Sequence, residues 1–458
     1  MELAMLRVTG SCPRLVAAAP AVFAALHAES GGPDGSVQGR SLSAAGPSPA
    51  GEPHSLPGLN KGVFYPPEVS PRGVRPVPLV AGRSRPTVGR VHCLVLLVDF
   101  TDNVGQRDPG EVREMLVSRG AYPTGSMRDF YHENSYGQLD LDGTVVGWLR
   151  MPQPYTYYTG GQRGLGAYPH NTQRLVEDAL TLAAQQVDFR RFDADGDLFL
   201  DGLFVVHAGG GAEAEVNPVT RLAKIWSHQW TIPQPFVSAG ITVYAYCATP
   251  EDGHIGVFCH EFGHMLGLPD LYDTSYRSSG VGQWCVMGTG SWNKRGLTPS
   301  HFCAWAKARL GWVSPTVVTT TQTLRLEPVA RPKTNVYRVR MRTATGSEYS
   351  LVEARQLVGF DSALPGAGLL VWRIDEAQPD NTRPGHYLVG LEQADGRHDL
   401  ELGRNTGDAG DPFPGTENTT EYDTATAPTF DPRRARPSGG TITEIQSRDE
   451  IVTCTVTV

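Results

Sequence analysis

The sequence has 458 residues, and its 48 Asp and Glu residues outnumber its 40 Lys and Arg residues, which gives a formal net charge of −8. A chain of this length has room for two or three domains with ample cores, and its acidic balance, without a basic run, argues against binding to nucleic acid or to an anionic membrane. No apolar run reaches the roughly 18 residues that a membrane-spanning helix needs, so we expect a globular protein, and 52 Gly with 35 Pro indicate one rich in loops.

A signal or pro-segment followed by a linker is expected in residues 1–87. Residues 15–28 are alanine-rich and apolar, as in a secretory signal peptide, but Pro20 interrupts them, and an amphipathic helix of a pro-segment is the alternative. Residues 30–85 are rich in Gly, Pro and Ser, which is typical of a linker or an extended pro-segment. We therefore expect the first globular domain at 88–314.

The first half of that domain predicts a buried strand and several helices. Residues 92–100 form a continuous apolar run, which favours a central strand with both faces covered. Helical spacing appears at 108–119 and, with an amphipathic pattern, at 172–186. Between them, Ser126 is a candidate N-cap with Asp129 three residues later, a variant of the capping box, so a helix is expected to start there.

An acidic loop follows the amphipathic helix. Acidic residues occupy positions 1, 3, 5 and 9 of this loop: Asp193, Asp195, Asp197 and Asp201. Together with the Phe199 carbonyl, their oxygens can converge on one hard cation. The match to an EF-hand loop is partial, because Phe204 stands where the closing glutamate would be. We predict calcium here, since clustered carboxylates without a cation would repel one another; a plain acidic turn is the alternative.

The most specific chemical signal is the run His260-Glu261-Phe262-Gly263-His264. In a helix over about 257–266, His260 and His264 lie one turn apart on the same face, so both imidazoles can reach one metal ion. Glu261 flanks them without having to be a ligand. This arrangement is typical of His-Glu-x-x-His metallopeptidases, in which two histidines bind zinc and the glutamate is the general base.

The residues after this helix offer a third ligand. Gly267 tolerates a positive φ and Pro269 disfavours a restart of the helix, so the chain can turn sharply. Asp270 stands where the longer zincin pattern has its third histidine, and an Asp oxygen is an acceptable zinc ligand. Asp273 is a rival, but the spacing favours Asp270. The predicted zinc ligands are therefore His260, His264 and Asp270.

Residues 256–273 resemble the immune inhibitor A-like metallopeptidases, which carry His-Glu-Phe-Gly-His-x-Leu-Gly-Leu-Pro-Asp-x-Tyr-Asp. The likeness extends to 284–293, where Met287 stands at the place of a Met-turn beneath the metal, and to 130–137. It implies an α+β zincin-like metallopeptidase domain. It also implies a secreted protein and a similar acidic loop.

Beyond residue 314 the pattern changes to short strand-like runs separated by turn residues: 324–326, 336–341, 349–353, 369–374 and 451–456. We therefore predict an all-β, sandwich-like C-terminal domain at 315–458. The stretch 407–415 also resembles the same family. Arg373 and Ala354 depart from it, since relatives often have His and Asn at these places, but neither position bears on the zinc ligands.

Several residues leave two interpretations open. Seven cysteines leave at least one thiol without a partner in the chain. Cys259 and Cys285, beside the metal-site segments, are either small core residues or a disulfide pair. Cys12 is either an incidental cysteine or a thiolate that occupies the open zinc position and silences a zymogen. Whether Asp408 and Asp411 hold a second cation is also open.

The combined pattern predicts a secreted, monomeric zinc endopeptidase that acts on proteins or peptides, with zinc and calcium as cofactors. Glu261 would take the proton of a zinc-bound water and hand it to the leaving amine, and Tyr272 is a candidate for oxyanion stabilisation. We expect 241–246 to be an edge strand that pairs with an extended substrate. The alternatives are a secreted non-catalytic binding protein with a structural zinc helix, which the presence of Glu261 disfavours, and a zinc amidohydrolase of non-protein substrates.

Overall fold

The structure, a computed structural model, describes residues 87–194, 196, 198–331, 335–340, 348–423 and 440–458, together with the two-residue strand β1 (Arg14–Leu15). Apart from β1, the expected signal or pro-segment and linker lie outside the described residues, and so does Cys12. Within the described part of the chain, no helix is both long enough and apolar enough to cross a membrane.

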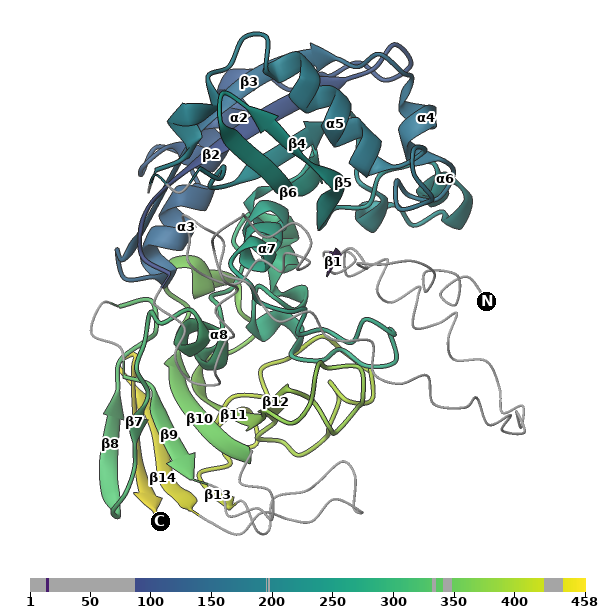
Figure 1. Cartoon of the computed structure of the whole chain (residues 1–458). Helices are drawn as coiled ribbons and strands as arrows, with labels where there is room; N and C mark the ends of the chain where they lie inside the picture. The colour runs from purple at the N-terminus through teal and green to yellow at the C-terminus, as the bar shows by residue number, and fades with distance from the viewer. Residues whose placement is uncertain are drawn as a thin grey trace.

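A six-stranded sheet forms the upper part of the molecule in Figure 1, with the strand order β1-β5-β6-β4-β2-β3. Its longer strands are β2 (Gly89–Asp99), β3 (Leu139–Arg150), β4 (Leu203–His207), β5 (His228–Ser238) and β6 (Ile241–Pro250). Strand β2 has parallel neighbours on both sides and is buried from residue 93 to its end, which confirms the predicted central strand. The expectation of an edge strand at 241–246 is wrong, because β6 lies between β4 and β5.

Local sequence signals account for the ends of the helices. The helices are α2 (Pro109–Val117), α3 (Met127–Asn134), α4 (Tyr155–Thr159), α5 (Thr172–Ala183), α6 (Pro218–Leu222), α7 (Ile255–Met265) and α8 (Ala304–Arg309). Asp108 caps α2 by accepting the Gly110 N–H at 2.7 Å. The predicted capping box of α3 is confirmed: the side chains of Ser126 and Asp129 each accept the backbone N–H of the other at 3.0 Å.

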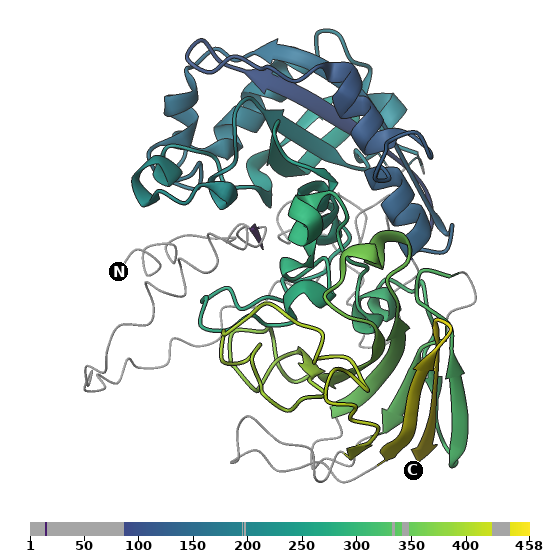
Figure 2. The ribbon, with the colours of Figure 1, turned by 180° about the vertical axis from the view of Figure 1, so that it is seen from behind.

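Helix α7 lies between the large sheet and the C-terminal strands (Figures 1 and 2). On one side, the Tyr131 hydroxyl of α3 donates to the Cys259 carbonyl at 2.7 Å, and the Tyr131 ring meets Phe262 edge-on at 5.2 Å between centroids. On the sheet side, Phe204 of β4 stacks on Phe262 at 6.1 Å. These aromatic contacts fix the helix by its apolar side chains, and every one of its residues is buried.

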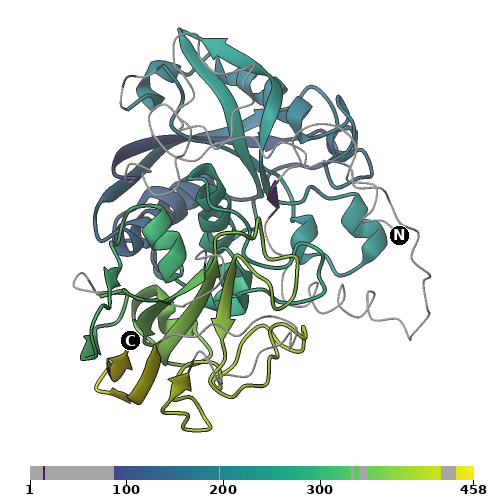
Figure 3. The same ribbon diagram turned by 60° about the horizontal axis from the view of Figure 1, so that its bottom comes forward.

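Two smaller sheets make up the C-terminal part of the chain (Figure 3). The first has the order β12-β11-β10-β9-β7 and consists of β7 (Thr316–Val317), β9 (Tyr337–Arg340), β10 (Glu348–Arg355), β11 (Gly368–Asp375) and β12 (Val389–Glu392). The second has the order β13-β14-β15-β8 and consists of β8 (Gln322–Leu326), β13 (Tyr422–Asp423), β14 (Thr441–Arg448) and β15 (Ile451–Thr457). The change of periodicity after residue 314 therefore marks a strand-rich region, as predicted.

The sheet that contains β10 and β11 is apolar on both faces. Leu351 and Trp372 point into the core that includes the six-stranded sheet and α7, whereas their neighbours Val352 and Val371 belong to a second core shared with the other C-terminal sheet. Successive strand residues face opposite sides, so each strand supplies both cores. The C-terminal strands thus close the main core from below and help to position the segment that carries α7.

Candidate metal centre

Helix α7 (Ile255–Met265) brings His260 and His264 onto one face, within two residues of the predicted span. It ends as the sequence indicates: Gly267 has φ +91°, and its N–H donates to the His264 carbonyl at 2.9 Å. A left-handed backbone conformation costs little at glycine. The chain can therefore double back and bring Asp270 toward the two histidines.

Each imidazole is oriented by a hydrogen bond from its Nδ1 atom. His260 Nδ1 lies 2.8 Å from the Val286 carbonyl oxygen, and His264 Nδ1 lies 2.8 Å from the Leu268 carbonyl oxygen. Since a carbonyl only accepts, these contacts place the proton on Nδ1 and the lone pair on Nε2. The rings are nearly perpendicular, with centroids 4.7 Å apart. This is the tautomer and support that metal-binding histidines use.

Asp270 faces both ring nitrogens with a single oxygen. Its Oδ1 lies 3.2 Å from His260 Nε2 and 3.1 Å from His264 Nε2. Burial alone would raise the pKa of Asp270, but its electrostatic interactions with the neighbouring imidazoles of His264 and His260 outweigh burial and lower the pKa to about 2. The carboxylate is therefore ionised at neutral pH, as a metal ligand must be.

The donor set fits zinc. The three ligand atoms of His260, His264 and Asp270 lie within 4.8 Å of one another. Two imidazole nitrogens and one carboxylate oxygen match the three-ligand sites of catalytic zinc, which leave a coordination position open. The Asp270 side chain keeps 12% of its surface exposed while the histidine side chains keep none, so the open side of the site lies toward Asp270.

The rival Asp273 has a different place in the structure. Its carboxylate accepts the Ser275 N–H at 2.8 Å and the Ser278 hydroxyl at 2.9 Å, and it is buried in the turn that these residues form. It is not in the group that faces the two imidazoles. Asp273 thus holds the loop after Asp270 rather than lining the metal centre.

Glu261 and Tyr272 are both buried beside the histidines. The Tyr272 ring lies 6.3 Å from the His260 ring between centroids. Burial, followed by the negative charge of Asp270, raises the pKa of Tyr272 well above its ordinary value. Its hydroxyl therefore stays protonated and can act as a hydrogen-bond donor near the metal centre.

Met287 packs against α7 on the side of Gly263. Its side chain is fully buried, its sulfur packs against Gly263 between the two histidines, and its carbonyl accepts the Leu271 N–H at 2.8 Å. One residue thus contacts both the helix that carries His260 and His264 and the loop that carries Asp270. This is the position that the resemblance implies for a Met-turn.

The acidic loop is described in part, because Asp195 and Asp197 lie outside the described residues. Asp193 accepts the Leu198 N–H at 3.0 Å, and Asp201 accepts the His92 N–H at 2.9 Å. Leu198 has φ +71°. It occupies position 6 of the loop, where an EF-hand has a glycine for a sharp turn, and at this position the leucine adopts the left-handed backbone conformation that glycine favours.

Other histidines lie away from this group. His207 is fully buried, and its Nδ1 lies 2.9 Å from the Ala208 carbonyl oxygen. His254 is the N-cap residue of α7. His301 Nε2 lies 2.7 Å from Glu133 Oε1, and its Nδ1 lies 2.8 Å from Lys307 Nζ. None of the three faces the site formed by α7.

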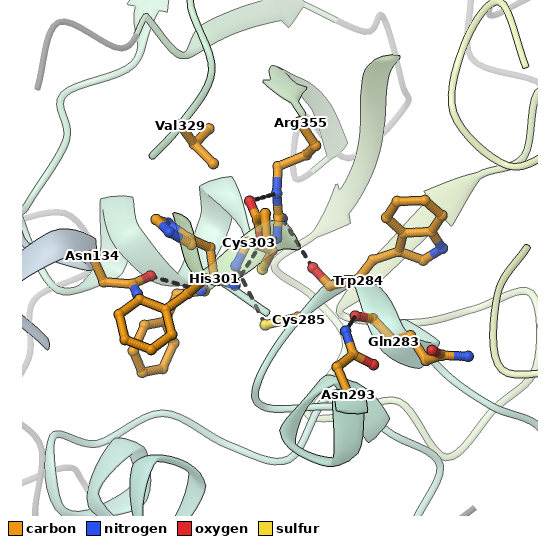
Figure 4. A network of polar contacts seen from close by, with 12 residues as sticks. Asn134, Gln283, Trp284, Cys285, Asn293, His301, Cys303, Val329 and Arg355 are labelled. Atoms are coloured by element: carbon orange, nitrogen blue, oxygen red, sulfur yellow. Dashed lines mark hydrogen bonds and ion pairs between the residues drawn. The ribbon is translucent and has the colours of Figure 1, made fainter. Parts of the chain in front are cut away.

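A buried polar network that the sequence did not predict supports the segment beneath α7 (Figure 4). Arg355, with no exposed side-chain surface, donates to both oxygens of Asp361 at 2.6 and 2.5 Å and to the Trp284 carbonyl at 3.0 Å. The Cys303 N–H donates to Cys285 Sγ at 3.3 Å. Because Arg355 and Trp284 are 71 positions apart, no local pattern could have indicated this contact.

The described cysteines are all free and buried. Of the two interpretations of Cys259 and Cys285, the structure thus supports small core residues and not a disulfide pair. The buried thiols of Cys259 and Cys93 have pKa values raised well above the ordinary range, mainly by burial. Such thiols are unreactive packing residues.

Residues 113–313 match the family model described as the catalytic domain of immune inhibitor A peptidase M6. Immune inhibitor A of Bacillus thuringiensis subsp. alesti is 36% identical over 261 residues, which is 46% of this chain and 38% of the Bacillus protein. Pre-pro-metalloprotease PrtV of Vibrio cholerae is 31% identical over 47% of this chain and 29% of its own length. A putative secreted metallopeptidase of Arthroderma benhamiae is 25% identical over 41% of this chain and 32% of its own length. The match therefore spans well under half of each relative.

Proposed function

Residues 113–313 belong to the immune inhibitor A family of metallopeptidases, and from that membership we propose that the chain is a secreted, zinc-dependent endopeptidase. The observation that carries this proposal is the position of Asp270 Oδ1, 3.2 and 3.1 Å from the Nε2 atoms of His260 and His264. One carboxylate oxygen that faces two imidazole lone pairs supports these residues as the zinc ligands.

Zinc bound at these residues would supply Lewis acidity toward the scissile carbonyl and lower the pKa of its water to about 7. Glu261 serves as the general base, taking the proton of the attacking water and later giving it to the leaving amine. Tyr272 donates a hydrogen bond to the carbonyl oxygen as it gains negative charge. The Val286 and Leu268 carbonyls hold the imidazoles in the required tautomer throughout.

An extended peptide substrate would bind along β5. Strand β1 already pairs there in antiparallel fashion, with Arg14 opposite Gln229 and Leu15 opposite His228. It also lies next to α7 (Figure 3). This contact supports two linked proposals: β5 is the strand that accepts substrate backbone, and the N-terminal segment occupies that strand in a zymogen. A role for Cys12 in latency stays a prediction.

We also propose calcium as a structural cation at Asp193, Asp195, Asp197 and Asp201. The left-handed Leu198 and the buried Asp201 carboxylate support an EF-hand-like turn around it. Residues 88–314 would form the zincin-like catalytic domain and 315–458 a sandwich-like β domain packed against it, preceded by a signal or pro-segment and linker at 1–87. We expect the enzyme to act as a monomer on proteins or peptides outside the cell.

The decisive test is Glu261→Ala in the full chain, assayed on casein before and after limited trypsin treatment, which would release a blocked substrate strand. We expect at least a roughly hundredfold loss of hydrolysis, with one zinc per chain retained in native mass spectrometry. Chelated wild-type protein, with and without restored zinc, is the control. Undiminished casein cleavage by the variant would refute the general-base role.

The same assays separate the competing functions. Wild-type protein that holds zinc but cleaves neither casein nor small amides would favour a binding protein with a structural zinc helix. Cleavage of small amides without cleavage of casein would favour an amidohydrolase of non-protein substrates. Buried Glu261 beside the ligands favours the peptidase, since a purely structural zinc site needs no general base.

A further inference from the structure

Arg221 in helix α6 has a buried guanidinium with an unsatisfied donor. The residue keeps only 6% of its surface exposed. Its Nη1 atom is buried and has no hydrogen-bond partner among the described residues, and none of their carboxylates forms an ion pair with this side chain. An arginine side chain stays charged in proteins, and a buried charge without an opposite charge is costly. The guanidinium therefore lacks an anion.

The acidic residues just before α6 compensate other groups. Glu213 accepts the Ser227 hydroxyl at 2.6 Å and the Ser227 N–H at 3.0 Å. Glu215 forms an ion pair with Lys224 at 2.9 Å. Since the described residues provide no carboxylate for Arg221, a bound molecule is the remaining source of one.

The backbone around Arg221 leads directly into the strand that we propose to accept substrate. The Arg163 N–H donates to the Leu222 carbonyl at 3.0 Å, and the Trp226 N–H donates to the Arg163 carbonyl at 3.0 Å. Strand β5 begins two residues after Trp226, at His228. These bonds hold the end of α6 close to the first residues of β5.

A substrate on β5 would run toward α6. Strand β1 pairs with β5 so that Arg14 lies opposite Gln229 and the next residue, Leu15, lies opposite His228. A peptide that pairs in the same sense continues past the start of β5, and α6 and β1 lie on the same side of the molecule (Figures 1 and 2). The residues that follow β1 in the sequence, 16–28, include no Asp or Glu. A substrate with an acidic side chain would thus offer a charge that this stretch lacks.

Two tyrosines connect the same region with the metal centre. The Tyr272 ring lies 6.3 Å from the His260 ring and 6.1 Å from the Tyr276 ring between centroids. Burial, followed by the charge of Asp270, raises the pKa of Tyr276, and the positive charge of Arg221 is among those that oppose this rise. Tyr276 therefore lies within electrostatic reach of both Asp270 and Arg221.

Arg163 adds a second positive charge to this region. Its guanidinium lies over the Trp226 ring, 5.3 Å from the centroid, and its charge also opposes the rise in the pKa of Tyr276. A guanidinium presents paired N–H donors that match the geometry of a carboxylate. Positive charge thus accumulates near the start of β5 and the loop that follows Asp270.

We propose that Arg221 is a specificity-determining residue that binds a carboxylate of the substrate, the side chain of an Asp or Glu close to the scissile bond. The inference rests on the proposed peptidase function and adds a substrate class to it. Because the cation is buried before substrate binds, a carboxylate that pairs with it relieves an existing cost and gains charge-assisted hydrogen bonds. A free C-terminal carboxylate has the same chemistry and is the alternative source.

Peptide pairs that differ only in Glu or Gln test the proposal. Both ends are blocked, the other residues are neutral, and the Glu or Gln is moved one position at a time across the cleavage site. After limited trypsin treatment, the zinc-loaded wild type should cleave the Glu peptide with a kcat/KM about tenfold or more above that of its Gln partner at one of these positions. Arg221→Gln should remove this preference. A gain seen only with an unblocked C-terminus would overturn the side-chain assignment and identify the terminal carboxylate as the bound group.

Two controls separate charge recognition from packing. Lys224→Gln removes a nearby positive charge that Glu215 already compensates, so it should leave the ratio of the two kcat/KM values unchanged. Arg221→Gln removes a buried charge without an ion-pair partner, so its Tm should not fall. Should that variant fail to fold, Arg221→Lys keeps the charge but not the planar donor pair, and it should retain only part of the preference.

Peptide binding to the inactive Glu261→Ala variant separates this inference from the proposed function. In fluorescence anisotropy, the labelled Glu peptide should bind about tenfold or more tighter than the Gln peptide, and adding Arg221→Gln should abolish the difference. Such selective binding without any cleavage by the wild type would support the carboxylate site and refute the peptidase. Cleavage of casein with equal kcat/KM values for every Glu and Gln pair would keep the peptidase and overturn the role of Arg221, as would a preference that Arg221→Gln retains. Neither cleavage nor selective binding would overturn both.

Discussion

The sulfur of Met287 packs on the backbone of Gly263, which lies in α7 between His260 and His264, the proposed zinc ligands. A β-carbon at residue 263 would lie 2.5 Å from Met287 Sδ and 3.3 Å from a ring carbon of Phe302, and both of these side chains are fully buried. The glycine therefore sets how closely the helix can approach the loop beneath it.

Gly263→Ala should accordingly destabilise the protein and weaken its affinity for zinc. In a helix without close neighbours, Gly→Ala would add about 1 kcal/mol of stability. We therefore expect the opposite sign here: urea denaturation should show a free energy of unfolding lower by about 1–3 kcal/mol, because the added methyl group overpacks the contact with Met287. Met287→Ala in the same chain should recover part of that loss, because it removes the sulfur. If Gly263→Ala alone were stabilising, the close contact would not exist in solution.

Asp270 and Asp273 provide a matched pair of substitutions. Asp270→Asn removes the charge that faces both imidazoles, so we expect zinc affinity to fall by about 10- to 100-fold or more in competition with a chelator. Asp273→Asn should keep zinc but lower the Tm, because its carboxylate accepts the Ser275 N–H and the Ser278 hydroxyl. The reverse pattern would make Asp273 the third ligand.

The grouping of His260, His264 and Asp270 was predictable because its geometry is local. His260 and His264 are one helical turn apart in any α-helix. Because Gly267 marks where that helix stops, both ends of α7 could be predicted to within two residues. Asp270 follows only a few residues later. Each of these features depends on spacing within a single short segment.

The sheet order and the supporting contacts were not predictable in this way. The alternating apolar and polar residues of β6 are typical of an edge strand, yet β5 pairs with its outer side. The residues 241–246 contain no signal that predicts this pairing. His301 meets Glu133 across 168 positions of sequence. Leu351 and Val352 are both apolar, so the pattern of β10 could not reveal that its two faces serve different cores.

Buried His228 should make the protein sensitive to mild acid. Burial lowers the pKa of His228 from 6.5 to about 4, while its Nδ1 donates to the Trp226 carbonyl. Between pH 6.5 and 4 the unfolded chain therefore binds a proton that the folded chain does not. Stability is present above pH 6.5 and is lost as the pH falls toward 4, by up to about 3 kcal/mol for this residue.

The comparison that isolates this effect is urea denaturation of wild type and His228→Gln at pH 7 and pH 4.5. We expect the variant to lose less stability between the two pH values. His170→Gln, at an exposed histidine, controls for the substitution itself. Burial also raises the pKa values of Glu213 and Glu401 to about 7, which works in the opposite direction, so only the difference between variant and wild type is diagnostic.

The acidic loop offers a substitution that should strengthen cation binding. Leu198 adopts φ +71° with 59% of its surface exposed, so its side chain contributes little packing to offset a conformation that costs about 1–2 kcal/mol for a residue with a β-carbon. Leu198→Gly should relieve that strain, raise the Tm, and increase calcium affinity at this loop. Gly196→Ala is the opposite change in the same turn: φ is +80°, and among the described residues no atom lies within 4 Å of the added β-carbon. Gly196→Ala should lower both the Tm and the calcium affinity, through backbone strain alone. If Leu198→Gly and Gly196→Ala changed these two quantities in the same direction, calcium binding at this loop would not depend on a left-handed backbone.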